Sequence, residues 1–205
     1  MITIIDYDMG NLGSILNMFK RLGVTNVRIT SDLNKINESS KIILPGVGSF
    51  KKAVKNLSRK GLIEILEKKV FQEEIPLMGI CLGMQLLFEK SEEGNCDGLG
   101  WIKGDVIKFD FKDNLSEFKV PHMGWNQTLI KKKSELVKNL PLNNKFYFAH
   151  SFFVKCKDYE DILMTTQYGA KFTSGIQKNN IFGFQFHPEK SHKYGIKIFE
   201  NFLKI

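Results

Sequence analysis

The residues with the clearest chemical potential form the segment Gly79-Ile-Cys-Leu-Gly83. It has the spacing of the nucleophile elbow, G-x-S-x-G, with cysteine in place of serine. In such an elbow a strand turns abruptly into a helix, and side chains two positions either side of the nucleophile would collide, so both are glycine. The pattern predicts that Cys81 is an exposed nucleophile whose sulfur lies near a helix N-terminus, where a thiolate is favoured.

An alternative interpretation makes Cys81 a buried structural cysteine beside two helix-packing glycines. We favour the nucleophile because the motif lies between a strand pattern at 76–80 and a helical pattern at 82–89. Cys96 and Cys156 lack such a context, and we expect both to be structural. The three cysteines show no metal-ligand spacing, which predicts a reduced, cytoplasmic protein without a metal site.

A cysteine nucleophile needs a general base, and His187 is the best placed of the four histidines. It directly follows an apolar run and precedes Pro188-Glu189. Residues two apart in an extended chain face the same side, so Glu189 can orient the imidazole of His187 as the third member of a triad. Taken alone, the segment would more often be a surface histidine. Beside the cysteine elbow it predicts a triad in the chain order nucleophile, base and acid.

An acyl-transfer site also needs donors for an oxyanion. We expect one from the backbone N–H of Leu82, directly after the nucleophile. The second is expected from Pro45-Gly-Val-Gly-Ser49, a glycine-rich segment that follows an apolar run. Glycine lets a peptide unit flip its N–H into or out of a site. An ordinary turn explains this segment equally well when it is considered by itself.

The elements that must position these residues alternate in the first half of the chain. The predicted strands are residues 2–5, 27–30, 42–44 and 76–80, then 106–109, 146–148, 152–154, 162–164 and 181–184. The predicted helices are residues 12–22, 62–70, 82–89 and 194–203. The alternation favours a central, mostly parallel sheet with helices on both faces, and the second half should be more antiparallel. We expect one α/β domain over residues 1–205.

Composition excludes several classes of protein. Of the 205 residues 42% are hydrophobic, too many for a disordered chain. No apolar run approaches the roughly 18–20 residues of a membrane helix. The net charge of +8 comes from lysine, since only Arg21, Arg28 and Arg59 are arginines. Because arginine is the usual contact for base edges and phosphates, a nucleic-acid-binding or scaffold protein is only a remote alternative.

Taken together, three motifs resemble those of the class I (triad) glutamine amidotransferases, and they cover the expected nucleophile, base and oxyanion donors. They are Pro45-Gly-Val-Gly48, Gly79-Ile-Cys-Leu-Gly-Met-Gln85 and Phe186-His-Pro-Glu-Lys190. Other segments are similar to the glutaminase subunits of imidazole glycerol phosphate synthases. They are residues 6–14, Pro121-His-Met-Gly-Trp-Asn126, Tyr147-Phe-Ala-His-Ser151 and His187-Pro-Glu-Lys-Ser191. This resemblance spans essentially the whole chain, and it implies a flavodoxin-like sheet.

The resemblance also implies a role for each matching position. Cys81 would be the nucleophile, His187 the general base and acid, and Glu189 its orienting partner. The oxyanion hole would use Val47, Gly48 and Leu82. Glutamine would contact Gln85, Tyr147, His150 and Ser151, and a partner subunit would contact Asn11, Met123, Trp125 and Lys190. Phe152 is a small departure, because a tyrosine is expected after this His-Ser pair.

The function implied is hydrolysis of L-glutamine to glutamate and ammonia, without a cofactor, metal, nucleic acid or membrane. The ammonia would pass to a separate (β/α)8-barrel synthase subunit in a heterodimer. That subunit would make imidazole glycerol phosphate and aminoimidazole carboxamide ribotide, in histidine biosynthesis.

The sequence also permits other interpretations of the function and of the residues predicted to contact a partner. A paralogous glutaminase would supply another synthase, for instance one that amidinates a sugar. Met123 and Trp125 can be core residues instead of interface residues, and Lys190 a solvated charge.

Overall fold

The computed structural model describes residues 1–111 and 118–205. Its helices are α1 Leu12–Arg21, α2 Leu33–Asn37, α3 Phe50–Arg59, α4 Leu62–Glu67, α5 Leu82–Gln85 and α6 His192–Lys204, with a π-helical turn at Lys68–Gln72. Its strands are β1 Ile2–Ile5, β2 Val27–Thr30, β3 Lys41–Leu44, β4 Leu77–Ile80, β5 Phe88–Ser91, β6 Cys96–Asp97, β7 Ile102–Lys108, β8 His122–Ile130, β9 Lys145–His150, β10 Phe152–Cys156, β11 Ile162–Tyr168, β12 Ala170–Lys178 and β13 Ile181–Phe184. None of the described helices is long and apolar enough to cross a membrane.

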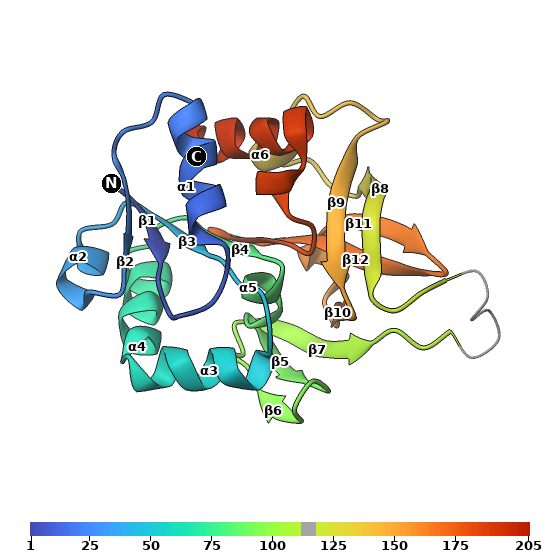
Figure 1. Cartoon of the computed structure of the whole chain (residues 1–205), viewed down its shortest axis with the longest axis horizontal. Coiled ribbons are helices and arrows are strands. Elements are labelled where there is room, and N and C mark those ends of the chain that lie inside the picture. Colours follow the sequence, from blue (N-terminus) through green and yellow to red (C-terminus); the bar gives the residue numbers. More distant parts are fainter. Residues whose placement is uncertain (112–117) are drawn as a thin grey trace.

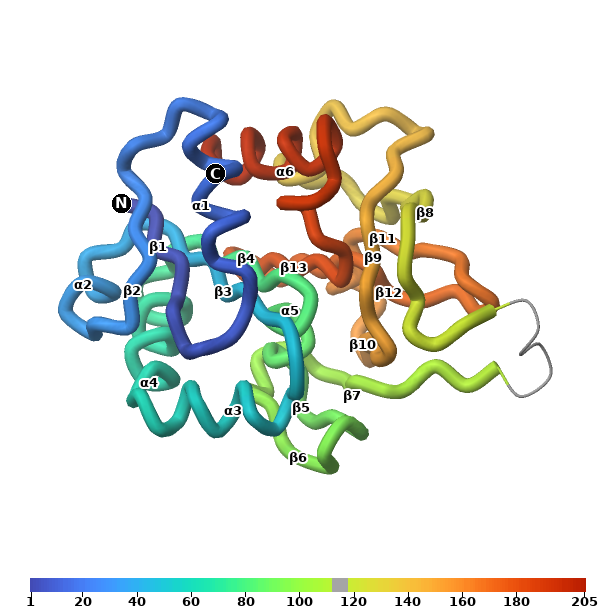
Figure 2. The backbone as a smooth tube through the Cα atoms, viewed as in Figure 1, coloured from blue at the N-terminus to red at the C-terminus, as the bar shows by residue number. Residues whose placement is uncertain are grey.

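The strands form one mixed sheet, which begins in the order β2-β1-β3-β4-β13-β12. The pairs from β2 to β13 are parallel, whereas β12 pairs antiparallel with β13, β10 and β11. Figure 2 shows β4 and β13 side by side at the centre of the molecule. Because these strands are parallel, the loops that follow β1, β3, β4 and β13 all leave the same edge of the sheet. These loops carry the predicted site residues.

Helices cover both faces of the parallel part, with α1 and α6 on one side and α3 and α4 on the other (Figure 1). Alternate residues of a strand point to opposite faces, and β4 follows this rule. Met78 and Ile80 pack with α1 and α6, whereas Leu77 packs with α3 and α4. The architecture predicted from the sequence, a mostly parallel sheet with a more antiparallel second half, is confirmed.

Several predicted elements differ from the structure. The helix expected at 82–89 ends at Gln85, and Phe88–Ser91 forms strand β5. The carbonyls of Leu86 and Leu87 accept hydrogen bonds from the N–H groups of residues 99, 101 and 102. Tertiary pairing therefore overrides a helical pattern here. Helices α2 and α3 and strands β8 and β12 were not predicted.

Candidate functional site

The turn after β4 has the geometry of a nucleophile elbow. Cys81 has φ 54° and ψ −110°, a left-handed conformation that a non-glycine residue adopts only when its surroundings enforce it. Its N–H donates to the Phe184 carbonyl at 2.7 Å. A Cβ on Gly83 would lie 1.9 Å from the Leu44 carbonyl oxygen, and one on Gly79 would lie 2.7 Å from the Gly83 carbonyl oxygen. Only glycine fits at either position.

The structure brings Cys81, His187 and Glu189 together. Nδ1 of His187 lies 2.8 Å from Oε1 of Glu189, and the Cys81 side chain is a hydrogen-bond partner of the same imidazole. The two side chains of the His187–Glu189 pair are almost fully buried. The predicted pairing is present, but its expected geometry is wrong. The chain is not extended here, because Pro188–Lys190 forms a 3₁₀ turn that carries Glu189 back under the imidazole.

The electrostatics of the site favour a charged imidazole. Burial opposes protonation of His187, but Cys81 and the Glu189 carboxylate outweigh it and raise the pKa of His187 to about 10. A nearby opposite charge stabilises the protonated form more strongly inside a protein than in water. At neutral pH His187 is therefore an imidazolium, held between a sulfur and a carboxylate.

Replacing Glu189 with glutamine should lower the free energy of unfolding in a pH-dependent way. The pKa of His187 is raised on folding, so its charged form stabilises the native state fully below about pH 6.5, and this stabilisation is lost as pH rises through about 10. We expect Glu189→Gln to cost about 1.5–3 kcal/mol at pH 6, the range for hydrogen bonds to charged groups. Urea denaturation of both proteins at several pH values measures the difference, which should shrink towards pH 10. A constant difference would contradict the charged pair.

The segment with His187 is fastened to strand β9 by a residue whose role was not predicted. Ser191 is fully buried; its Oγ donates to the His187 carbonyl at 2.6 Å and accepts from the Tyr147 N–H at 3.0 Å. The His187 N–H in turn donates to the Tyr147 carbonyl at 2.8 Å. The position of the imidazole is therefore set by β9 as well as by β13.

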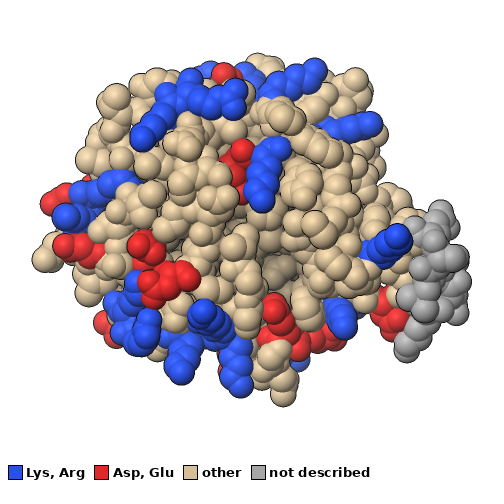
Figure 3. Space-filling view, in the orientation of Figure 1, with Lys and Arg blue, Asp and Glu red and all other residues tan. Residues whose placement is uncertain are grey.

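A pocket of about 240 Å³ opens beside the nucleophile. Figure 3 shows a hollow among uncharged residues near the middle of this face, with Lys, Arg, Asp and Glu mostly towards its margins. Seven of the residues predicted for catalysis, the oxyanion hole or glutamine binding line the pocket: Val47, Gly48, Cys81, Leu82, Gln85, His150 and Ser151. Tyr147, expected to contact glutamine, is absent from its described lining. The ring of Tyr147 instead lies 6.1 Å from that of Trp125, its cross-strand partner on β8.

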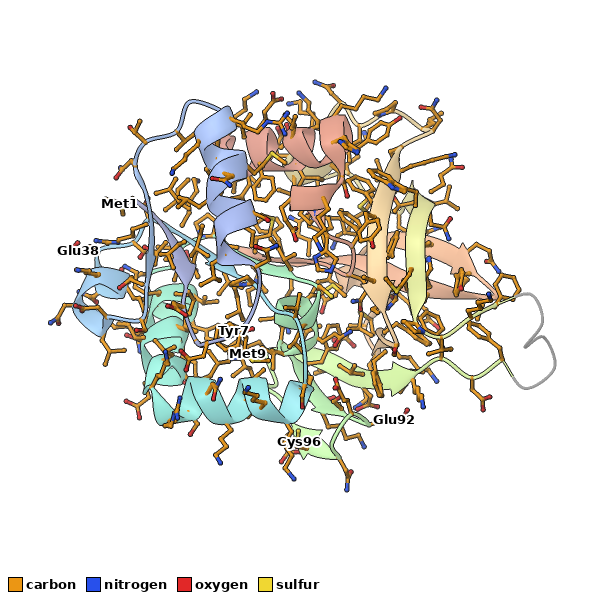
Figure 4. All side chains as sticks on the ribbon, viewed as in Figure 1. Met1, Tyr7, Met9, Glu38, Glu92 and Cys96 are labelled. Atoms are coloured by element: carbon orange, nitrogen blue, oxygen red, sulfur yellow. The ribbon has the colours of Figure 1, made fainter. Side chains whose placement is uncertain are left out.

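The glycine-rich segment 45–49 lies directly against the elbow. A Cβ on Gly46 would approach the Gly83 nitrogen and the Tyr7 hydroxyl to 2.7 Å, so the two loops are in backbone contact. The Tyr7 hydroxyl donates to the Pro45 carbonyl, and Figure 4 shows Tyr7 and Met9 on the loop beneath this segment. Gly48 has φ 104°, which favours glycine. Leu82 is the first residue of α5, so its N–H group has no carbonyl acceptor within the helix.

The residues predicted to contact a partner are all exposed. Met123 is 63% and Trp125 43% exposed, which excludes the alternative that they are core residues. Met123 also lines the pocket, and Trp125 stacks on His192 at 5.1 Å. The Lys190 ammonium lies 5.7 Å from the centre of the Tyr147 ring. Asn11 is exposed and caps α1 by accepting from the Ser14 N–H.

Two polar residues near the nucleophile were not predicted. Nε2 of Gln185 lies 3.6 Å from Sγ of Cys81. Nδ1 of His122 lies 3.0 Å from Nε2 of His150. The available signal for Gln185 was a single polar residue within the apolar run 181–186. Among the described residues, no group of three or more His, Cys, Asp or Glu side chains is arranged to hold a metal ion.

Comparisons with known proteins agree with this geometry. The model of the family described as glutamine amidotransferase class-I matches residues 3–205. The chain is 53% identical over 204 residues to imidazole glycerol phosphate synthase subunit HisH 2 of Methanococcus maripaludis, covering 100% of this chain and 99% of that protein. It is 43% identical to the HisH 2 subunit of Pseudomonas aeruginosa, with 100% of both chains covered.

Solved structures show the same fold at low sequence identity. A crystal structure of a glutamine amidotransferase matches with a TM-score of 0.76 at 16% identity, covering 100% of this chain and 98% of that one. The structure of PurLQS from Thermotoga maritima matches with a TM-score of 0.74 at 19% identity, covering 99% and 97%.

Proposed function

The chain belongs to the class I glutamine amidotransferases and, within them, to the HisH subunits of imidazole glycerol phosphate synthase, and from this premise we propose that it hydrolyses L-glutamine through Cys81, His187 and Glu189. One observation carries the proposal. A cysteine on a strained elbow shares a hydrogen-bonded imidazole with a buried carboxylate, at the wall of a pocket. This is the arrangement of a nucleophile, a proton carrier and an orienting acid.

In the first half of the reaction the Cys81 thiolate attacks the side-chain carboxamide carbon of glutamine. The oxyanion that forms is held by the N–H of Leu82 and by an N–H of loop 45–49. The imidazolium of His187 gives its proton to the departing nitrogen, so ammonia leaves and a γ-glutamyl thioester remains. Glu189 keeps Nδ1 of the imidazole engaged throughout, which leaves Nε2 for the proton transfer.

In the second half the neutral imidazole accepts a proton from water, and the resulting hydroxide attacks the thioester. The carbon–sulfur bond breaks, glutamate leaves, and the thiolate and imidazolium are restored. Atoms balance as glutamine plus water giving glutamate plus ammonia, with no external reductant or metal in the cycle.

The pocket presents a hydrogen-bond acceptor to the substrate glutamine. Both amide hydrogens of Gln85 are donated within the protein, to the Phe152 carbonyl and to Gln185. Its carbonyl oxygen is therefore the group left for a donor on glutamine, such as the α-ammonium. His150 and Ser151 complete this side of the pocket.

The exposed apolar side chains Met123, Trp125 and Val47 around the pocket fit a partner subunit better than water. We propose that Asn11 and Lys190 join them in contacting a (β/α)8-barrel synthase in a cytoplasmic heterodimer, which takes the ammonia through a channel. That synthase would form imidazole glycerol phosphate and aminoimidazole carboxamide ribotide in histidine biosynthesis.

A second candidate changes only the acceptor. Both relatives described above are named HisH 2, so each name distinguishes one copy from another. A paralogous copy would supply ammonia to a different synthase, for example one that amidinates a sugar. The residues of the glutaminase site are the same in both cases, because ammonia leaves before the acceptor reacts.

Purification with the partner tests both proposals. Without its partner, the chain should hold loop 45–49 in a conformation that lacks one oxyanion donor. One missing donor costs about 10²–10³ in rate, so the isolated chain should release glutamate slowly. Addition of the copurified partner and its acceptor should raise kcat by about that factor, because acceptor binding favours the competent conformation of loop 45–49. Glutamate release with and without partner is the measurement.

Mass spectrometry of the copurified chain identifies the acceptor synthase. A histidine-pathway cyclase supports the first candidate, and another synthase supports the second. Full glutaminase turnover by the isolated chain would contradict control by loop 45–49.

A further inference from the structure

Gln185 lies against the nucleophile and belongs to none of the three triad positions. It follows strand β13 directly and is fully buried. Its Nε2 lies 3.6 Å from Sγ of Cys81, a hydrogen-bond distance for sulfur, and its Oε1 lies 3.0 Å from Nε2 of Gln85. The side chain thus connects the nucleophile to the wall of the pocket, while it is itself absent from the described lining.

One backbone carbonyl determines which way the Gln185 amide faces. The Phe152 oxygen can only accept, and Nε2 of Gln85 donates to it at 2.9 Å. Gln85 therefore turns its NH₂ group, not its oxygen, towards this part of the core. Gln185 must then present its oxygen to Gln85, which leaves its own NH₂ group for Cys81. The reversed amide would place two donors together and an oxygen against the sulfur.

The same carbonyl also determines which ring nitrogen of each of the two buried histidines carries the proton. Nδ1 of His150 lies 2.7 Å from the Phe152 oxygen and must donate to it, so Nε2 of His150 is an acceptor. Nδ1 of His122 lies 3.0 Å from that nitrogen and donates to it. Burial lowers the pKa of His150 to about 3 and that of His122 to about 4, so both rings are neutral. The charged His187 also lowers the pKa of His150.

We propose that Gln185 is a positioning residue, which holds the Cys81 sulfur by donating an amide hydrogen to it within a hydrogen-bond network ordered by the Phe152 carbonyl. The sulfur then has Gln185 as a donor in addition to its interaction with the His187 imidazole. Donation to a thiolate stabilises it and limits the directions in which it can approach a substrate. The predicted effect of Gln185 on glutamine turnover rests on the proposed glutaminase activity, whereas its predicted effect on the reactivity of the Cys81 thiol does not.

The experiment measures alkylation of Cys81 by iodoacetamide from about pH 5 to about pH 10 in the full chain, since only the thiolate reacts. Mass spectrometry of the peptide that contains Cys81 separates it from Cys96 and Cys156. Gln185→Glu keeps the shape and still accepts from Gln85, but its carboxylate cannot donate to sulfur. Gln185→Leu removes the donor without adding charge. Gln177→Leu is the matched control, because Gln177 is a glutamine of β12 whose side-chain oxygen accepts no hydrogen bond from the described residues.

We expect Gln185→Leu to move the pH midpoint of alkylation upward by about one unit, equivalent to about tenfold less thiolate at a given pH. Gln185→Glu should move it further, because of repulsion between the two negative charges. With the partner present, kcat for glutamine should fall about tenfold while KM changes less than about threefold, since Gln185 does not line the pocket. Gln177→Leu should match the wild type in both measurements, and thermal melts verify that each variant is folded.

An unchanged alkylation profile in folded Gln185→Leu, whose side chain cannot donate a hydrogen bond, would overturn the role of Gln185. A wild-type Cys81 that does not react with a glutamine-analogue electrophile would instead overturn the proposed glutaminase. The two failures are distinguishable because iodoacetamide needs no glutamine site.

Discussion

Cys81→Ala should abolish glutamine-dependent synthesis by the complex and leave synthesis from free ammonia intact. The variant removes the sulfur that forms the thioester, and no other described cysteine can replace it. Cys96 and Cys156 do not line the pocket, and burial raises the pKa of Cys156 to about 12. Loss of the nucleophile in a hydrolase triad lowers turnover by orders of magnitude, and we expect a fall of at least about 10⁴-fold in kcat.

The measurement is product formation by the complex with glutamine or with ammonium salt as nitrogen source. Cys156→Ala is the matched control, and it should keep glutamine-dependent activity. Glutamine-dependent turnover in Cys81→Ala would show that the nucleophile is a different group. Failure of Cys81→Ala to copurify with the partner would indicate that the variant no longer assembles with it.

Gly83→Ala should be among the most destabilising substitutions in the chain. The new methyl group would lie 1.9 Å from the Leu44 carbonyl oxygen and 2.8 Å from its carbon, both backbone atoms of a central strand. Relief requires β3 and the elbow to move apart, which disrupts the packing of two adjacent loops of the site. We expect a loss of at least about 4 kcal/mol in the free energy of unfolding, the range of exceptional single substitutions.

Gly13→Ala provides the comparison. Gly13 lies in helix α1 with nothing within 4 Å of its added Cβ, so alanine should be neutral or stabilising by about 0.5–1 kcal/mol. Urea denaturation of both variants and the wild type measures the difference. If Gly83→Ala unfolds at the wild-type urea concentration, the contact between elbow and β3 is not as tight as described.

Much of the first half of the fold, although not α2 and α3, could be predicted from the sequence because its signals are local. Strands such as β1 and β4 are short, buried apolar runs, and α1 shows its apolar stripe within ten residues. Strands β8 and β12 could not be predicted in this way, since both contain many polar residues and lack the short apolar run that marks β1 and β4. The helical pattern at 82–89 was misleading because distant N–H groups bind the carbonyls of Leu86 and Leu87.

The features of the site also fall into those that local sequence indicates and those that only contacts between distant segments determine. The sequence by itself indicated the elbow at Cys81, because the glycine spacing of residues 79–83 is a local signal and a Cβ on Gly79 would collide with Gly83, although the contact that requires Gly83 comes from Leu44 on β3. It also indicated the pairing of His187 with Glu189, two positions apart. The tertiary structure alone decided where the Tyr147 ring points and which group lies behind the sulfur. The Gln185 amide takes its direction from the Phe152 carbonyl on another strand, and a hydrogen bond between distant segments leaves no spacing that a sequence can show.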